Sequence, residues 1–465
     1  MAAAKSSKSD EMPVNMEDDR VPTPPRQDDS QQSDSRKLHE NKGFTNSCGE
    51  PKKGLQKKPM NASYSEQMGL EAGRSLLPGE DGPTARDFGL AEDNEVRCPD
   101  SSQKGDDGII RMVEAATKVE QLEQRLLADW SHLRRARLAA DEGKARLREA
   151  LAGLDSEDTS VVVSGSLARG EFTSGSDIDW TLLIDGSADP RHHDLFREIG
   201  MKVKPFASKE PGAEGTFGSM VFSHDLIHEV GGEDDTNRNT TRRLLLLLES
   251  RALGREDAYQ RVVRSILNRY LLEDRGLWKG SGHRVPRFLQ NDFARYWRTM
   301  AVDFAYKLRK RAGKGWAIRN IKLRMSRKLI YVSGLLACYR CHLDYSPQDR
   351  KVIFGDPDRH KEVVEHMEAV FRETPLDIVA GVLLRYAHLD EAARKIFDAY
   401  NGFLGILADD QSRGHLENLS EDLADKDETY QRARQLSHSF RDGLLAFFFD
   451  AESELDNMTK NYGVF

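Results

Sequence analysis

Residues 161–171 read Val-Val-Val-Ser-Gly-Ser-Leu-Ala-Arg-Gly-Glu, and residues 176–184 read Ser-Asp-Ile-Asp-Trp-Thr-Leu-Leu-Ile. The valine run and the later Trp-Thr-Leu-Leu-Ile run are typical of buried strands, because β-branched and aromatic side chains fit the pleated conformation. The Gly-Ser pair and the small residues after it predict a tight turn into a short helix. The two segments therefore predict a strand, a helical turn and a second strand.

Two aspartates stand at alternate positions at the start of the second predicted strand. Successive side chains of a strand point to opposite faces, so Asp177 and Asp179 share one face, with Cα atoms roughly 6.5–7 Å apart. Carboxylates so placed can hold the paired divalent cations that assist in-line displacement at phosphorus. The backbone at Gly165 and Ser166 can approach an anion closely, because glycine has no Cβ. The segment predicts a site for a metal ion and a nucleotide.

These residues resemble the signature of the DNA polymerase β-like nucleotidyltransferase superfamily. The resemblance rests on Gly165 and Ser166, on Arg-Gly-Glu at 169–171, and on Asp177 with Asp179. Within the superfamily, the two segments are most similar to the bacterial PII-uridylyltransferase and glutamine synthetase adenylyltransferase branch. The run Leu-Leu-Leu-Leu-Leu-Glu-Ser-Arg-Ala-Leu-Gly that ends at Gly254 also resembles the helix that follows the catalytic sheet in that branch.

The resemblance implies transfer of a nucleoside monophosphate from an NTP to an acceptor, with release of pyrophosphate. Asp177 and Asp179 would be catalytic and would hold Mg²⁺ or Mn²⁺, while Gly165, Ser166 and Arg169 would bind the nucleotide. Because this branch modifies proteins, a protein side chain is the favoured acceptor. Two alternatives are a small-molecule, antibiotic-type nucleotidyltransferase and a nucleotide second-messenger synthase. An alternative of another class is a non-catalytic nucleotide-binding sensor or interaction module.

A third carboxylate stands on a neighbouring strand in many relatives, and that strand runs hydrophobic-acid-hydrophobic-Gly in the uridylyltransferases. Residues 195–203, Leu-Phe-Arg-Glu-Ile-Gly-Met-Lys-Val, are similar to this pattern and nominate Glu198 as a third catalytic residue. Asp225, Glu229 and the acidic residues 233–235 compete with Glu198 for this role. The identity of the third carboxylate is open at this point.

A basic segment, residues 307–328, surrounds a Gly-Lys-Gly-Trp sequence at 313–316. Lys322 and Arg319, with Lys314 as a further option, are candidates to bind the β- and γ-phosphates, because charge that builds on a leaving pyrophosphate needs cationic partners. The alternative is a solvated basic face. We do not expect a nucleic-acid partner, because few aromatic side chains accompany these cations.

Two smaller motifs lie in the second half of the chain. Arg242 and Arg243 fall in the first turn of the predicted leucine-rich helix, where cations oppose the helix dipole, so we expect one of them to meet an anion or an acidic side chain. Residues 338–342 match the Cys-x-x-Cys-His of haem attachment. They continue an apolar helical pattern and no export signal precedes them, so we expect neither haem nor zinc there.

The fold class predicted from these patterns is α+β: a small mixed-sheet nucleotidyltransferase core followed by an all-α helical bundle, with a disordered N-terminal tail. The tail lacks periodic apolar residues and is too polar to bury a core. In the core, residues 196–206 and 216–224 are two further strand-like runs. The expected parts are the disordered tail at 1–107, one amphipathic helix packing on the core at 108–150, the core at 151–235 and the helical domain at 236–465.

Composition favours a soluble, cytoplasmic protein. The 465 residues carry a formal net charge of −8, which gives no overall attraction to nucleic acid or to an anionic membrane. The four cysteines are too few and too scattered for a disulfide framework. No run approaches the roughly 18 apolar residues that a membrane span needs, so we expect no membrane partner.

Overall fold

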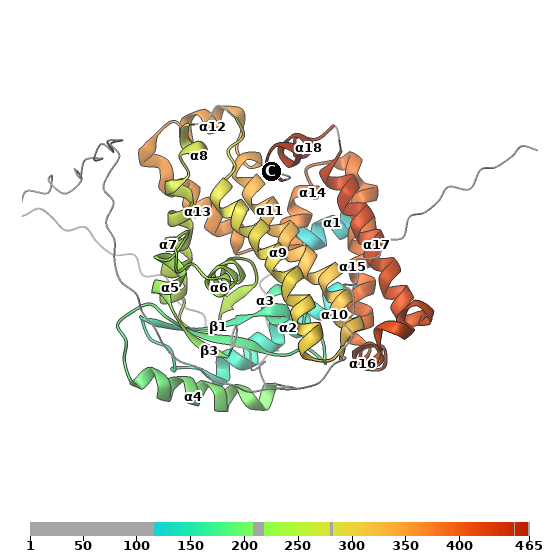
Figure 1. Cartoon of the computed structure of the whole chain (residues 1–465). Helices are drawn as coiled ribbons and strands as arrows, with labels where there is room; N and C mark the ends of the chain where they lie inside the picture. Colours follow the sequence, from blue (N-terminus) through green and yellow to red (C-terminus); the bar gives the residue numbers. More distant parts are fainter. Residues whose placement is uncertain (1–115, 208–217, 280–281, 451, 464–465) are drawn as a thin grey trace, which may run out of the picture. The chain divides into compact units, whose positions relative to one another are not determined.

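The computed structural model describes residues 116–207, 218–279, 282–450 and 452–463. The chain divides into two units, Met1–Lys104 and Gly105–Phe465, and every described residue belongs to the second unit. The predicted tail therefore lies outside the described residues. Within the second unit, a small mixed sheet is followed by a predominantly helical region, which confirms the predicted fold class (Figure 1).

The sheet has four strands in the order β3-β2-β1-β4. Strand β1 pairs antiparallel with both β2 and β4, whereas β2 and β3 run parallel. The sequence did not predict β4, which lies inside the region expected to be entirely helical. The strands are β1 at Thr159–Ser164, β2 at Asp179–Ile184, β3 at Ser219–Phe222 and β4 at Ser250–Ala252.

The two faces of the sheet contribute to two different apolar clusters. Val161 and Val163 of β1 pack in the smaller cluster, while Val162 joins the large core of the helical region. In β2, Leu183 also belongs to the large core. Asp179 lies four residues before Leu183, so its side chain leaves the strand on the face that carries the helical region.

The single amphipathic helix predicted at 108–150 is wrong for its described part, which forms two helices. These are α1, Lys118–Leu126, and α2, Ser131–Ala150. The chain breaks at Leu127, which adopts the left-handed conformation with φ 51°. Helix α2 packs on the short helix α3, Gly165–Arg169, as expected for a helix that covers the core, whereas α1 packs on α14, Pro375–Leu383.

The strand predicted at 196–206 is also wrong. Its residues belong to helix α4, Arg191–Val203, and to a 3₁₀ turn, η1, at Lys204–Phe206. Ile199 and Val203 stand one helical turn apart and are both buried, so a helical period fits this run better than alternation does. The second predicted run, 216–224, contains β3 and then enters α5, Ser223–Ile227.

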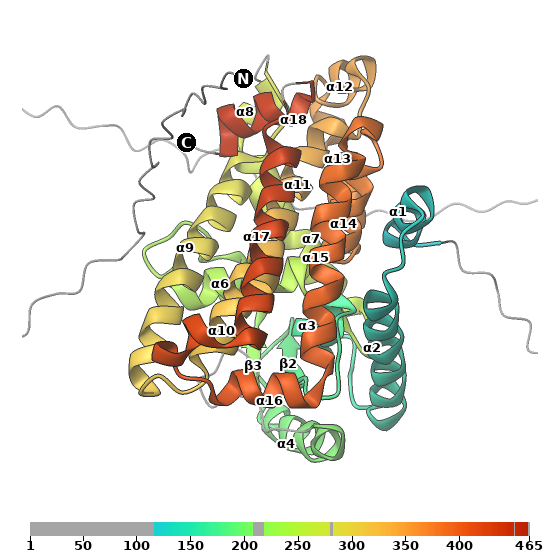
Figure 2. The same cartoon turned by 90° about the vertical axis from the view of Figure 1, so that its right-hand side faces the viewer.

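The remaining described chain is helical. Figures 1 and 2 both place α9, α11 and α15 on one side of the sheet and α4 on the other. None of the described helices is long and apolar enough to cross a bilayer. The bounds are α6 Asn237–Leu248, α7 Asp257–Glu273, α8 Arg275–Lys279, α9 Arg287–Lys310, α10 Trp316–Lys322, the π-helical η2 Leu323–Arg327, α11 Lys328–Leu343, α12 Pro347–Ile353, η3 Pro357–Arg359, α13 His360–Phe371, η4 Ala387–Leu389, α15 Asp390–Ala408, α16 Asp410–Asn418, η5 Glu421–Lys426, α17 Glu428–Phe448, α18 Glu454–Met458 and the π-helical η6 Thr459–Gly463.

Candidate active site

Gly165 and Ser166, the Gly-Ser turn, follow β1 directly and begin α3. Strand β1 pairs with β2, the strand that begins at Asp179. Gly165 has φ +71°, a conformation that favours glycine. A Cβ at this position would lie 2.8 Å from Oδ2 of Asp179, closer than a real side chain tolerates. Glycine therefore allows the turn to approach the carboxylate of Asp179.

A cavity of about 140 Å³ lies where this turn meets the helical region. It brings together six residues that were predicted from the sequence as site residues, and it adds side chains from η2, α15 and α16. The predicted residues are Gly165, Ser166, Arg169, Asp177, Asp179 and Lys322. The others that line it include Ser326 and Arg327, which lie in the basic segment 307–328 but were not named as site residues, and Leu404 and Arg413, for which the sequence carried no recognised motif.

A second, larger cleft of about 720 Å³ adjoins this cavity. The two spaces share Asp177, Lys322 and Arg413 as lining residues. Arg319, the other predicted phosphate ligand, lines only the larger cleft. Its remaining charged residues are Lys310, Arg311, Lys314 and Glu417. The cleft is therefore mainly basic and opens beside the aspartates.

The two aspartates differ in exposure and lie close enough for their charges to interact. Asp177 is exposed and Asp179 is half-buried. Burial raises the pKa of Asp179 to about 6, and the nearby carboxylates of Glu249 and Asp177 act in the same direction, while Arg327 and Arg169 oppose the shift. Such a pair of hard oxygen donors fits a divalent cation such as Mg²⁺.

A buried ion cluster lies next to Asp179. Arg169 donates from Nε and Nη2 to Oε2 of Glu171 at 3.0 and 2.9 Å, and from Nη1 to Glu249. Nη1 of Arg327, from η2, lies 3.6 Å from Glu249. Burial disfavours the charged form of Arg169. The carboxylates of Glu171 and Glu249 favour it more strongly and raise the pKa of Arg169 well above its usual value. Arg169 therefore ties α3 to the helical region, and its predicted contact with a nucleotide stays a prediction.

Glu249 is the carboxylate that the sequence interpretation missed. It follows α6 directly and precedes β4, and its side chain is fully buried. The register places its neighbour Ser250 opposite Ser164, which in turn lies opposite Asp179. The sequence pattern that could have indicated this role is an acidic residue at the end of an uninterrupted leucine run. A carboxylate buried at such a position requires charged or polar partners.

None of the six acidic candidates for the third carboxylate lines either the cavity at Asp179 or the basic cleft. Glu198 lies on the exposed side of α4, with Oε1 3.7 Å from Nζ of Lys202. Asp225 and Glu229 lie near His224, at 4.0 and 3.9 Å from its Nδ1. Glu233 and Asp234 are exposed, whereas Asp235 is buried. The strand that the resemblance to the uridylyltransferases assigned to Glu198 is a helix here.

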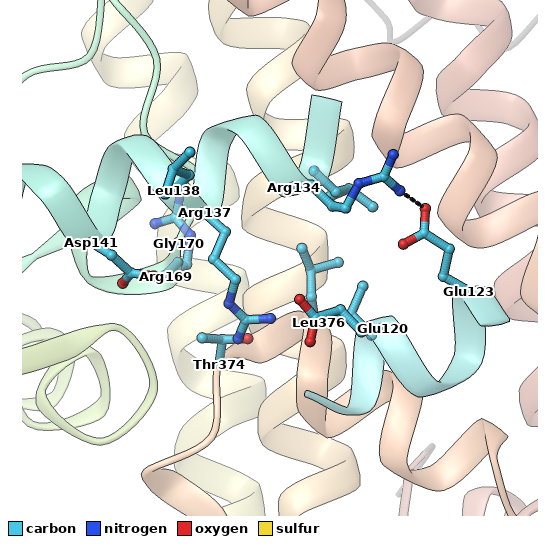
Figure 3. Close-up of a pocket in the computed structure, with 12 residues that line it drawn as sticks. Glu120, Glu123, Arg134, Arg137, Leu138, Asp141, Arg169, Gly170, Thr374 and Leu376 are labelled. Atoms are coloured by element: carbon cyan, nitrogen blue, oxygen red, sulfur yellow. Dashed lines mark hydrogen bonds and ion pairs between the residues drawn. The ribbon is translucent and has the colours of Figure 1, made fainter. Parts of the chain in front are cut away.

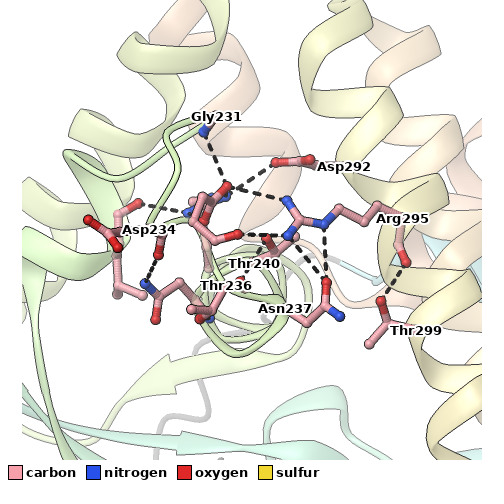
Figure 4. A network of polar contacts seen from close by, with 12 residues as sticks. Gly231, Asp234, Thr236, Asn237, Thr240, Asp292, Arg295 and Thr299 are labelled. Atoms are coloured by element: carbon pink, nitrogen blue, oxygen red, sulfur yellow. Dashed lines mark hydrogen bonds and ion pairs between the residues drawn. The ribbon is translucent and has the colours of Figure 1, made fainter. Parts of the chain in front are cut away.

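Asp235 instead pairs with Arg243, which confirms the expectation that one arginine of this pair meets an acidic side chain. The fully buried Arg243 donates to Oδ2 of Asp235 at 2.9 Å and lies 3.2 Å from Oδ2 of Asp292. Figure 4 shows this network, in which Arg295 from α9 also donates to the carbonyl oxygen of Asp235 at 2.7 Å. Arg242 donates to Oγ of Ser219 at 2.8 Å. The network fixes the start of α6 against α9.

The side chains around Cys338 and Cys341 form no part of the candidate active site. Both cysteines are buried and free. His342 meets His283 and Glu454 in a group whose ligand atoms lie within 4.8 Å of one another. Nδ1 of His342 already accepts the backbone N–H of Arg284 at 2.9 Å, and its Nε2 lies 2.9 Å from Glu454. Both ring nitrogens of His342 therefore have partners within the protein. Both views place α18, which carries Glu454, at the end of the helical region away from β2.

A separate cavity of about 300 Å³ lies between α1, α2 and α14, behind α3 (Figure 3). Its prominent charged side chains already have partners. Arg134 pairs with Glu123, and Arg137 pairs with Asp377. Arg169 and Gly170 also line this cavity, and Arg169 is a lining residue of the candidate active site as well.

Comparison with known proteins agrees with the geometry of the core. Residues 144–213 match the family model described as nucleotidyltransferase domain, a range that contains β1, α3, β2 and α4. The match supports the superfamily and does not distinguish the uridylyltransferase and adenylyltransferase branch. Searches of the curated proteins and of the solved structures gave no match.

Proposed function

We propose that this protein is a metal-dependent nucleotidyltransferase that moves a nucleoside monophosphate from an NTP to an acceptor and releases pyrophosphate. The observation that carries the proposal is the single cavity lined by the Gly-Ser turn, both aspartates and Lys322. The nucleotidyltransferase match over residues 144–213 supports the same reaction class. A protein side chain is the acceptor that the resemblance to the protein-modifying branch favours.

The residues of the cavity have different roles in the proposed reaction. Asp177 and Asp179 would hold Mg²⁺ or Mn²⁺, which supplies Lewis-acid stabilisation of the charge that develops on the phosphoryl oxygens. The turn at Gly165 lets backbone N–H groups approach the triphosphate. Lys322, at the junction with the basic cleft, would bind the phosphates that leave.

Incubation with each radiolabelled NTP and Mg²⁺ or Mn²⁺ tests the proposal. The expected result is release of pyrophosphate together with a labelled acceptor, detected by gel for a protein and by thin-layer chromatography for a small molecule. Stabilisation of the protein by MgNTP without pyrophosphate release would instead identify a non-catalytic sensor. Labelled product without a labelled protein would redirect the proposal to a small acceptor or a second messenger.

Reversing the charge of Lys322 or Arg319 should weaken NTP binding more than it weakens folding. Burial lowers the pKa of Lys322 to about 8, with further lowering by Arg413 and Arg327, so an anion at this position would relieve the repulsion among cations. We expect Lys322→Glu or Arg319→Glu to raise the dissociation constant for NTP about tenfold, equivalent to about 1.4 kcal/mol. Lys307→Glu is the matched control, because Lys307 pairs with Asp303 and lines neither the cavity nor the cleft. Titrations that overlay the wild type would rule out the phosphate contact.

Acid should weaken metal binding by protonating Asp179. Its pKa of about 6 in the metal-free protein means that protons and Mg²⁺ compete as the pH falls through 6. We expect the Mg²⁺ concentration for half-maximal turnover to rise about fourfold between pH 7.5 and pH 5.5, from the fraction of ionised carboxylate. Metal titrations at both pH values measure this. A pH-independent requirement would mean that Asp179 is not a metal ligand.

A further inference from the structure

Arg413 of α16 occupies the junction between the catalytic cavity and the basic cleft. It lines both spaces, as do Asp177 and Lys322. Unlike the exposed cations Lys310 and Arg311 of the cleft, Arg413 is 6 % exposed. Because the Arg413 side chain is buried, its position is fixed. Its positive charge is therefore available to a ligand that extends from the cavity into the cleft.

The loop that leads to Asp177 holds Arg413 in this position. Nη1 of Arg413 donates to Oγ1 of Thr173 at 3.4 Å, and Ser174 donates to Oδ1 of Asp410 in the same helix at 2.8 Å. Gly175 lies directly against the guanidinium, because a Cβ there would lie 2.6 Å from Nε of Arg413. Glycine at 175 therefore provides the space that the Arg413 side chain occupies.

Among the described residues, the ion-pair partner of Arg413 is Glu417. Its Nε lies 3.3 Å from Oε1 of Glu417, whose side chain is 36 % exposed at the cleft. These contacts use Nε and Nη1 of a group that carries five N–H donors. Lys322 lines the same junction, and the two cations repel each other. Two adjacent cations at the wall of a cavity favour an anion between them.

The size of the two spaces indicates which anion this is. The catalytic cavity, at about 140 Å³, is smaller than the roughly 300 Å³ at which small-molecule sites begin. A nucleotide whose α-phosphorus lies at the aspartates must therefore extend across the junction into the cleft. The groups at the junction are an aspartate for metal and two cations, which is the chemistry that recognises a metal-bound pyrophosphate unit.

We propose that Arg413, together with Lys322, binds the two phosphates of the NTP that are not transferred, and that Gly175 is the positioning residue that keeps the Arg413 guanidinium at the junction. This inference rests on the proposed function. Helix α16 of the helical region then completes a site whose other members come from the sheet and from α10.

Binding of inorganic pyrophosphate, NMP and NTP to the full-length protein with Mg²⁺ tests this inference by calorimetry. We expect Arg413→Gln to raise the dissociation constants for pyrophosphate and for NTP at least tenfold, and that for NMP less than twofold. Arg413→Lys should recover part of the loss. Glu417→Gln is the matched control, because it removes the partner carboxylate but leaves the cation, and it should bind pyrophosphate as tightly as the wild type or more tightly.

Gly175→Ala provides an independent test that leaves every charge in place. It should weaken pyrophosphate binding while NMP binding and the melting temperature change little, since the methyl group displaces only the Arg413 side chain. Equal pyrophosphate binding by the wild type, Arg413→Gln and Gly175→Ala would overturn the role of Arg413 and leave the proposed function standing. Failure of the wild type to bind NTP or pyrophosphate at all would overturn both.

Discussion

Replacing Asp177 or Asp179 with asparagine should reduce nucleotide transfer by about a thousandfold. A metal ion contributes several kcal/mol of transition-state stabilisation, and each 1.36 kcal/mol corresponds to a factor of ten in rate. Asparagine keeps the size of the side chain but removes the charge that holds the cation. Pyrophosphate release under saturating NTP and Mg²⁺ measures the loss.

The same substitution at Asp179 should stabilise the protein when no metal is present. Burial raises the pKa of Asp179 above its unfolded value, so the ionised form destabilises the native state above pH 6. The penalty disappears as the pH falls from 6 towards 4, where both states take up the proton. The free energy of unfolding of Asp179→Asn should therefore exceed that of the wild type by about 1–3 kcal/mol at pH 7.5, and the two values should agree near pH 4.

Variants that fold, lack activity and show this stability profile would indicate that the aspartates bind a metal ion. Carboxylates with a purely structural role would not give this result. Glu198→Gln is the matched control for the transfer assay, because Glu198 lies on the exposed side of α4 and pairs only with Lys202 at the surface. It should retain wild-type turnover. Full activity of both aspartate variants would refute the site assignment, and loss of activity in Glu198→Gln would restore Glu198 as the third carboxylate.

Glu249→Gln should be among the most destabilising single substitutions in the chain. The side chain is fully buried and pairs with Arg169 and Arg327, so neutralising it leaves a cation uncompensated in the interior. Breaking a buried pair in this way costs about 3–5 kcal/mol, and we expect the lower end because Glu171 still pairs with Arg169. Chemical denaturation with and without MgNTP measures the loss.

An exposed ion pair provides the comparison for Glu249. Glu391→Gln on α15 removes a carboxylate that pairs with Lys395 one turn later, and its side chain is 82 % exposed. Such pairs contribute little to folding, so the variant should unfold like the wild type. If Glu249→Gln were equally harmless, the cluster around Arg169 would not hold the helical region against the sheet.

The sequence was sufficient for the parts of the site that depend on local geometry. A glycine turn and two aspartates two residues apart are close in sequence, and the structure places Gly165, Asp177 and Asp179 in one cavity, although Asp177 precedes β2 and only Asp179 belongs to the strand. Lys322 was found because its segment is densely charged. These features follow from short-range periodicity and composition.

The missed features depend on contacts between distant segments. Strand β4 is only three residues long and carries no alternating pattern of its own, so only its pairing with β1 defines it. Arg413 lines the candidate site, and Glu249 pairs with Arg169 beside it, because α16 and the end of α6 return to the sheet from far along the chain. The run at 195–203 was assigned to a strand by its likeness to the uridylyltransferases, although Ile199 and Val203 already stood at helical spacing.

The buried cluster of Arg169, Glu171, Glu249 and Arg327 also bears on whether the nucleotidyltransferase core is an autonomous folding module. Residues 144–213 match the family model and include Arg169 and its partner Glu171, yet the second carboxylate, Glu249, follows α6 and the second arginine, Arg327, comes from η2. A fragment that ended before Glu249 would expose one edge of β1 and would leave Arg169 without one of its two carboxylate partners. The segment that matches the nucleotidyltransferase model therefore could not be excised or exchanged alone, and the smallest transplantable piece must include the segments of the helical region that supply Glu249 and Arg327.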